Sequence, residues 1–184
     1  MINRIPRSVP PPSTFTTIAV SVEFKVTAPN NTTLHIDWGN GDSENVAMTG
    51  SQITINKNYG SGGTRVILFS GNANTALTSL NCSSNSLTAL DISTNTALTS
   101  LRCYSNSLTA LDVSTNTELT SLYCYSNSLT SAVINSHMAD LVSAGLNGGT
   151  YSGAQTPSAP PTGQGITDKA TLIASPRLWS VTTD

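Results

Sequence analysis

Residues 98–116 read LTSLRCYSNSLTALDVSTN, and this pattern of leucine, cysteine and asparagine recurs both before and after that stretch. The blocks 74–94 and 95–115 and the stretch from residue 116 onward align without a gap, at a period of 21. The recurring positions are Leu77, Leu80, Cys82, Asn85, Leu87, Leu90 and Ile92, then Leu98, Leu101, Cys103, Asn106, Leu108, Leu111 and Val113, then Leu119, Leu122, Cys124, Asn127 and Leu129. A fixed period of this length predicts repeats that stack on one another and share a core.

The spacing inside each block is itself doubled, which predicts two short strands and two turns per repeat. Because side chains alternate along a strand, Leu80 and Cys82 are expected to point inward while Asn81 points outward. The same alternation assigns a structural core to Leu80, Cys82, Leu101, Cys103, Leu122 and Cys124. The asparagines at the turns are expected to bond backbone groups that the bends leave unpaired, and they are Asn74, Asn95, Asn116, Asn85, Asn106 and Asn127.

This frame resembles the short bacterial leucine-rich repeats that have two strands per coil. The resemblance covers residues 72–137. It implies a β-solenoid in which a single coil cannot close its own core, so that both ends of the stack need caps.

Upstream of the repeats, β-rich runs alternate with turn clusters. The expected strands are 15–20, 23–27, 34–38, 52–56 and 65–70. Short strands at such spacing are typical of a small β-sandwich. The run 36–43, which contains Trp38 and the turn Gly39-Asn40-Gly41, together with Tyr59, resembles the PKD-like domains of immunoglobulin type. In this sequence Arg65 stands where that family has an aromatic residue.

Downstream, the repeat frame degrades, and His137 stands where the turn asparagine would fall. A helix is expected over 133–146, followed by a Pro-rich loop, a short helix that begins at Thr167 and a strand over 178–182. The stretch 161–173, which reads PTGQGITDKATLI, together with WSVTT at 179–183, resembles the C-terminal cap of repeat proteins from Bacteroidetes-type bacteria and their phages, which include virion and fibre-like proteins.

Together these segments predict a mainly β fold, in which a small β-sandwich is followed by a leucine-rich-repeat β-solenoid and a small α/β C-terminal cap. The expected boundaries are 1–13 for a Pro-rich N-terminal arm, 14–71 for the PKD-like sandwich, 72–137 for the solenoid and 138–184 for the cap.

Composition excludes several classes of function. Of the 184 residues, only 10% are charged and the formal net charge is −2, so nucleic-acid binding is not expected. Ser, Thr and Asn are abundant instead. No apolar run reaches the length of a transmembrane helix. Residues 10–12 are prolines where a secretory signal needs an apolar segment, so no Sec signal is expected.

Candidate catalytic and metal-binding residues are few. The three cysteines recur in an inward column and are interpreted as small buried hydrophobic residues. His35 and His137 fall in different segments, so no nucleophile–histidine arrangement is predicted. No enzyme activity and no cofactor are therefore expected. Asp37, Asp42 and Glu44 flank a Gly-rich turn and form a candidate calcium site, with a solvated turn as the alternative interpretation.

The repeats differ mainly at two outward columns. Asn81, Arg102 and Tyr123 form one column, and Ser83, Tyr104 and Tyr125 form the other. Tyrosine and arginine dominate protein interfaces, so Arg102, Tyr104, Tyr123 and Tyr125 form the candidate binding face. The alternative is a solvated face on which tyrosine ladders only stabilise neighbouring strands.

These features predict a non-enzymatic structural or recognition protein. The leading hypothesis is a phage virion component, such as a head decoration, spike or fibre, located on the particle surface. Its partners would be other virion proteins, bound through the N-terminal arm, and a host-surface protein or glycan, bound through the solenoid. Self-association into a homo-oligomer is compatible with this role, and insertion into a membrane is not expected. The alternative is an adhesion module on a bacterial cell surface, which binds a host protein or glycan.

Overall fold

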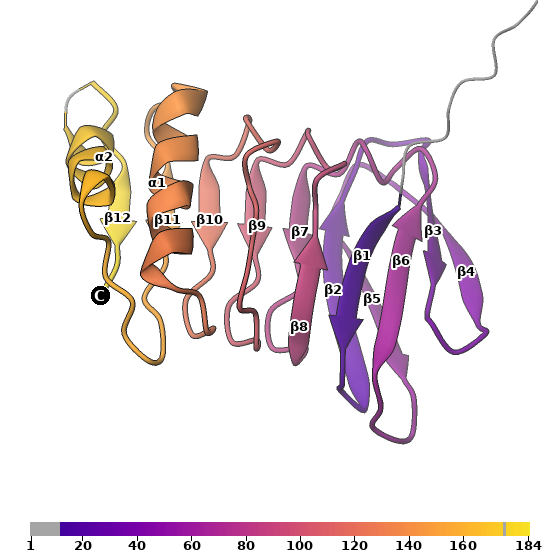
Figure 1. The fold of residues 1–184 in the computed structure, drawn as a ribbon. Coiled ribbons are helices and arrows are strands. Elements are labelled where there is room, and N and C mark those ends of the chain that lie inside the picture. The colour runs from indigo at the N-terminus through magenta and orange to yellow at the C-terminus, as the bar shows by residue number, and fades with distance from the viewer. Residues whose placement is uncertain (1–11, 175) are drawn as a thin grey trace, which may run out of the picture.

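The computed structural model describes residues 12–174 and 176–184, which form an elongated molecule (Figure 1). Its elements are β1 (Ser13–Thr17), β2 (Ser21–Thr27), β3 (Thr33–Asp37), β4 (Ser43–Ala47), β5 (Ile53–Asn58), β6 (Arg65–Ser70), β7 (Ser79–Asn81), β8 (Leu87–Asp91), β9 (Ser100–Arg102), β10 (Ser121–Tyr123), α1 (Ser131–Ala144), β11 (Thr150–Ser152), α2 (Gln164–Ile173) and β12 (Ser180–Thr182). Most of the predicted N-terminal arm, residues 1–11, lies outside the described residues.

Two sheets form the layers of the molecule. The five-stranded sheet has the order β4-β3-β6-β1-β8, and the seven-stranded sheet has the order β12-β11-β10-β9-β7-β2-β5. In the view of Figure 1 the seven-stranded sheet lies behind the five-stranded sheet and behind α1. The buried apolar side chains between these layers form one continuous core, which reaches from Phe15 to Trp179.

Residues that are one repeat period apart lie opposite each other on neighbouring parallel strands. Leu101 of β9 lies opposite Leu80 of β7 and opposite Leu122 of β10. Strands β11 and β12 continue the parallel pairing beyond the last repeat. The predicted stacking of equivalent residues is confirmed for these strands.

The predicted fold class is wrong. The described residues form a mixed α/β fold with two helices and two sheets, not a small β-sandwich followed by a leucine-rich-repeat β-solenoid with a cap. Both sheets run across the expected boundary near residue 72, because β8 pairs with β1 in one sheet and β7 pairs with β2 in the other. The antiparallel strands β1 and β2 each have an edge whose backbone groups need partners, and the first repeat supplies them.

The expectation of two strands in every repeat is also wrong. β8 is a strand because β1 pairs with it, whereas the equivalent segment 108–113 pairs with no strand among the described residues and is irregular. The inward positions of the repeat are kept without the ladder, since Leu108, Leu111 and Val113 are buried there.

Both helices lie after the repeats and pack against each other. α1 begins after Thr130, whose hydroxyl accepts from the Val133 amide, and it ends at Gly145 in the left-handed conformation (φ 75°). The helix expected at 133–146 is thus confirmed to within two residues at each end. α2 begins at Gln164, three residues before the expected start. Neither helix in the described part of the chain has the length and apolar character that a bilayer crossing requires.

Candidate recognition surface

The inner columns of the parallel strands are buried. Leu80, Leu101, Leu122, Cys82, Cys103 and Cys124 all have no exposed surface. The three thiols are free, and burial raises the pKa of both Cys82 and Cys124 to about 12 and raises that of Cys103 well above its usual range. At neutral pH these sulfurs are therefore protonated, and they pack as small apolar groups rather than act as nucleophiles.

The turn asparagines bond the backbone of neighbouring repeats. Asn106 Nδ2 donates to the Cys82 carbonyl (3.0 Å) and to the Cys103 carbonyl (2.9 Å), while its Oδ1 accepts from the Asn85 amide (2.9 Å). In the other asparagine column, Asn95 Nδ2 donates to the Asn74 carbonyl at 2.6 Å. The predicted contact with backbone groups is confirmed for Asn85, Asn95, Asn106, Asn116 and Asn127. It is wrong for Asn74, whose side chain bonds the side chains of Thr94 and Asn95.

The first outward column presents arginine beside tyrosine on the seven-stranded sheet. Register places Asn81, Arg102, Tyr123 and Ser152 side by side on β7, β9, β10 and β11. The exposed Arg102 guanidinium lies 5.3 Å from the centre of the Tyr123 ring, within cation–π distance. Each residue thus restrains the other, and the column offers a cation and a phenol at fixed positions.

The second outward column, here called the ring column, consists of Ser83, Tyr104, Tyr125 and Ala154. Backbone bonds that continue the parallel ladder keep these residues in register, from Ser84 N to Tyr104 O (3.1 Å), from Ser105 N to Tyr125 O (3.1 Å) and from Ser126 N to Ala154 O (2.8 Å). The Tyr104 and Tyr125 rings stack with their centres 4.6 Å apart and their planes 4° apart. Arg102, Tyr104, Tyr123 and Tyr125 thus lie together on one sheet surface, which we call the tyrosine face.

Behind this sheet, a buried hydrogen-bonded chain joins α1 to the last parallel strands. His137 Nε2 lies 3.0 Å from the Leu111 carbonyl and therefore carries the proton, so Nδ1 accepts from the Tyr151 hydroxyl at 3.1 Å. The Tyr151 hydroxyl in turn accepts from the Cys124 thiol at 3.8 Å. Desolvation lowers the pKa of His137 to about 4. The predicted separation of the two histidines holds, since His35 lies in β3 and contacts Asn45.

The three candidate calcium ligands are engaged separately. Asp37 Oδ1 accepts from the Gly39 amide at 2.9 Å, and Asp42 Oδ2 accepts from Lys57 Nζ at 2.6 Å. The hydrogen bond from Lys57 lowers the pKa of Asp42. Glu44 is exposed in β4. Within residues 12–174 and 176–184, no group of three metal-ligating side chains comes together, so the geometry favours the interpretation as a solvated turn.

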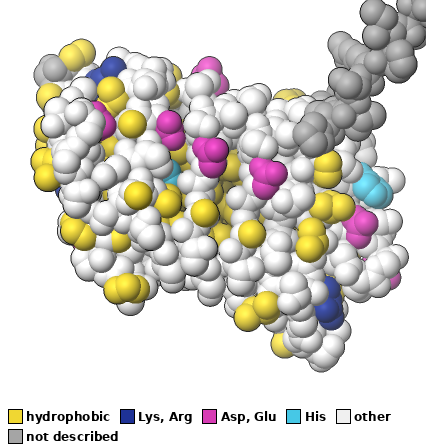
Figure 2. All heavy atoms as spheres, viewed as in Figure 1, with side chains coloured by type: hydrophobic (Ala, Val, Ile, Leu, Met, Phe, Trp, Pro, Cys, Tyr) yellow, Lys and Arg dark blue, Asp and Glu magenta, His cyan; other side chains and the backbone are white. Residues whose placement is uncertain are grey.

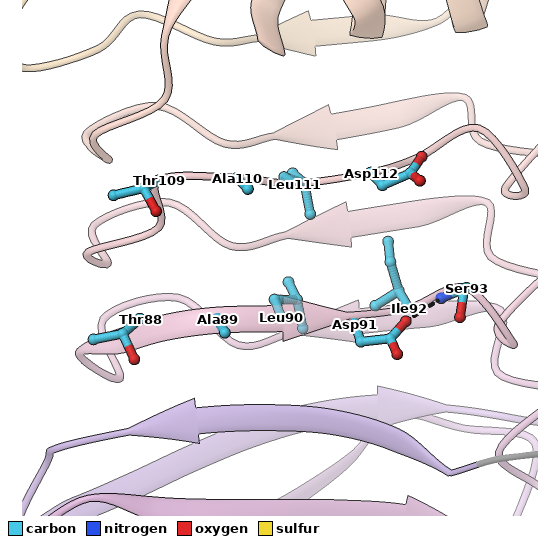
Figure 3. Close-up of a pocket in the computed structure, with 10 residues that line it drawn as sticks. All are labelled: Thr88, Ala89, Leu90, Asp91, Ile92, Ser93, Thr109, Ala110, Leu111 and Asp112. Carbon is cyan, nitrogen blue, oxygen red and sulfur yellow. Dashed lines mark hydrogen bonds between the residues drawn. The ribbon is translucent and has the colours of Figure 1, made fainter.

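The opposite side of the molecule has a shallow groove of about 360 Å³ between residues 88–93 and 109–112 (Figure 3). Asp91 and Asp112 stand at the same end of the two segments, and each accepts a turn hydrogen bond, from the Ser93 and Ser114 amides at 2.9 Å. Acidic side chains on this side are spaced singly among uncharged ones (Figure 2). Sequence reasoning missed this groove, and the only signal for it was the small outward residue, Ala89 or Ala110, in each repeat.

Comparison of the chain with protein-family models, curated proteins and solved structures gave no match.

Proposed function

We propose that this chain is a non-enzymatic recognition protein that binds its partner through the tyrosine face. The observation that carries the proposal is the stacked pair of Tyr104 and Tyr125 beside the Arg102–Tyr123 pair on the seven-stranded sheet, where Arg102 is exposed and the three tyrosines are half-buried. Tyrosine and arginine are the residue types in which binding energy concentrates at interfaces.

The arrangement lowers the entropic cost of binding. The backbones of Tyr104 and Tyr125 are fixed by the parallel ladder, and each phenol ring is held against the other. A partner that contacts these rings therefore restricts few side-chain motions that were free before binding. Less conformational entropy is lost, so more of the contact energy appears as affinity.

We place this recognition face on the surface of a phage particle, with a bacterial cell surface as the alternative. The support is compositional, because a surface rich in Ser, Thr and Asn with only 10% charged residues suits a neutral exposed protein. Detection of the chain by mass spectrometry in purified particles would support the first location. Detection in bacterial envelope fractions alone would contradict it.

The binding role is tested by replacing both stacked tyrosines with serine. The Tyr104→Ser, Tyr125→Ser variant is expected to lose adhesion to bacterial cells that the unmodified chain binds, with a nearly unchanged melting temperature, because neither ring belongs to the core. A matched control, Thr88→Ser with Thr109→Ser, changes two exposed side chains of the opposite groove and should keep adhesion. Unaltered adhesion of the tyrosine variant would exclude the tyrosine face. Failure of the unmodified chain to adhere to any strain of a broad bacterial panel would overturn the proposed function.

A further inference from the structure

The stacked tyrosines leave one ring face each without an aromatic neighbour. Tyr104 and Tyr125 cover each other on their inner faces. The next residue of the ring column is Ser83 beside Tyr104 and Ala154 beside Tyr125. Serine and alanine are too short to cover a phenol ring, and strands in a sheet lie about 4.8 Å apart. The space above each small residue therefore has the thickness of one more ring.

The two outer faces differ in their polar surroundings. On the Tyr104 side, the Asn81 carboxamide oxygen accepts from the Ser83 amide (3.1 Å) and the Ser83 hydroxyl (2.7 Å). The Asn81 Nδ2 group makes no hydrogen bond within the described residues and is left to face a ligand. The Arg102 guanidinium lies toward Tyr123 on β10, on the other side of β9. On the Tyr125 side, the corresponding neighbours are Ser152 and Ala154. Of the two spaces, the one above Ser83 combines an aromatic face with a free amide N–H donor, that of Asn81.

The residues around the space above Ser83 favour one class of ligand over the others. Nucleobases also stack on tyrosine, but their phosphates need basic partners. Next to this space lies Lys25, but its ammonium group is paired with the Glu23 carboxylate at 3.1 Å, so it is not free to bind a phosphate. Tyrosine and arginine also serve protein interfaces, but the buried centre of such an interface is more apolar than this surface. The exposed large hydrophobic residues of the described chain lie elsewhere, at Ile18, Val20, Val66, Ile166, Ile173 and Leu178. A sugar ring fits better, because it offers an apolar C–H face to the phenol and hydroxyl groups to the surrounding donors.

Resting on the proposed function, we infer that the partner is a polysaccharide, one of whose pyranose rings stacks on the outer face of Tyr104 above Ser83. Asn81 Nδ2 donates to a hydroxyl group of that ring. Tyr125 supports Tyr104 from the inner side, so the phenol ring is already held in place before the sugar binds.

The experiment compares four variants of the full chain on bacterial cells that the unmodified chain binds, with bound protein detected by antibody. Tyr104→Phe keeps the ring and should retain binding, whereas Tyr104→Leu keeps an apolar side chain without the ring and should bind about tenfold or more weakly. Ser83→Tyr fills the proposed space and should abolish binding. Ala154→Tyr fills the equivalent space beside Tyr125 and is the matched control, which should bind like the unmodified chain. Circular dichroism confirms that each variant is folded.

The same cells, treated in two ways, identify the class of ligand. Periodate, which cleaves the vicinal diols of sugars, should remove binding, and protease treatment should leave it. Loss of binding after protease but not after periodate would overturn the polysaccharide inference while the proposed function stands. Equal binding by Ser83→Tyr and Ala154→Tyr would overturn the assignment to the space above Ser83. The proposed function fails only if adhesion survives the loss of both stacked tyrosines or is absent altogether.

Discussion

At the turns of the repeats, single asparagine side chains bond the backbones of two neighbouring repeats at once. Asn127 Nδ2 donates to the Cys103 carbonyl (3.1 Å) and the Cys124 carbonyl (2.9 Å), and its Oδ1 accepts from the Leu108 amide (3.1 Å). The side chain is 2% exposed, so water cannot replace these bonds. One residue therefore satisfies three backbone groups that the turns would otherwise leave unpaired.

Replacing Asn127 with alanine is expected to lower the free energy of unfolding by about 1–3 kcal/mol, because buried donors and acceptors lose their partners. Denaturation in urea measures this change. Asn56→Ala is the matched control, since Asn56 is exposed in β5, and its effect should stay within about 0.5 kcal/mol. Equal effects of the two substitutions would show that the turn hydrogen bonds contribute no more than a surface contact.

At the scale of elements, α1 takes the place of a further repeat. His137 lies one repeat period after Asn116, at the position of a turn asparagine. Asn116 Nδ2 donates to the Ile92 carbonyl (3.2 Å), and His137 Nε2 donates to the Leu111 carbonyl (3.0 Å). The histidine thus makes the same kind of bond from a helix that the asparagine makes from a turn, and it anchors α1 on the last repeat.

The buried histidine makes stability depend on pH. In the folded chain the pKa of His137 is about 4, against an ordinary value of 6.5, so between these values the unfolded chain binds a proton that the folded chain does not. The stabilisation is therefore complete above pH 6.5 and is lost as the pH falls toward 4, by about 3 kcal/mol in total. Urea denaturation across this range measures the loss.

His137→Gln, which cannot titrate, should be less stable at neutral pH and should lack this pH-dependent component. His35→Gln removes the other imidazole and serves as the matched control. A His137→Gln profile parallel to that of the unmodified chain would show that other groups cause the loss.

Apolar patterns in the sequence located most strands of the antiparallel region but not all of them. The alternating apolar runs located β2, β3, β5 and β6 to within a few residues, because period-two alternation reports a half-buried strand directly. β4 was missed, since its residues Ser43–Ala47 are mostly exposed and an edge strand carries little apolar alternation. The four residues of the candidate binding face were identified from repeat differences, but the pairing of their rings depends on side-chain conformations that no sequence pattern specifies.

At the scale of the whole molecule, the two sheets make one body of the antiparallel and parallel regions. The seven-stranded sheet contains β5 and β2 from the first region and β7, β9, β10, β11 and β12 from the rest, without an interruption in pairing. Trp38 and Trp179, 2% and 3% exposed, belong to the same core although they lie in different regions of the chain. Continuous pairing and a shared core predict unfolding as one cooperative unit.

The two tryptophans report on this cooperativity. Trp38→Phe and Trp179→Phe each leave a single tryptophan, and the two variants should show the same unfolding transition by fluorescence as by circular dichroism, after correction for any shift that the substitution causes. A fluorescence transition that precedes the circular-dichroism transition in either variant would show that the molecule consists of separate folding units.

The repeated spacing of residues was sufficient to predict the parallel register, the inward leucines and cysteines and the role of most turn asparagines, because it forces equivalent residues into equivalent surroundings. It also identified the outward positions where the repeats differ. Three features could be seen only in the folded chain: the first repeat completes both sheets, the later repeats lack a second strand, and Tyr104 and Tyr125 stack face to face. Those features depend on which strand edges and side chains meet across distant parts of the chain. Hydrogen bonds between strand edges use backbone groups, so they impose no periodic pattern on the side chains.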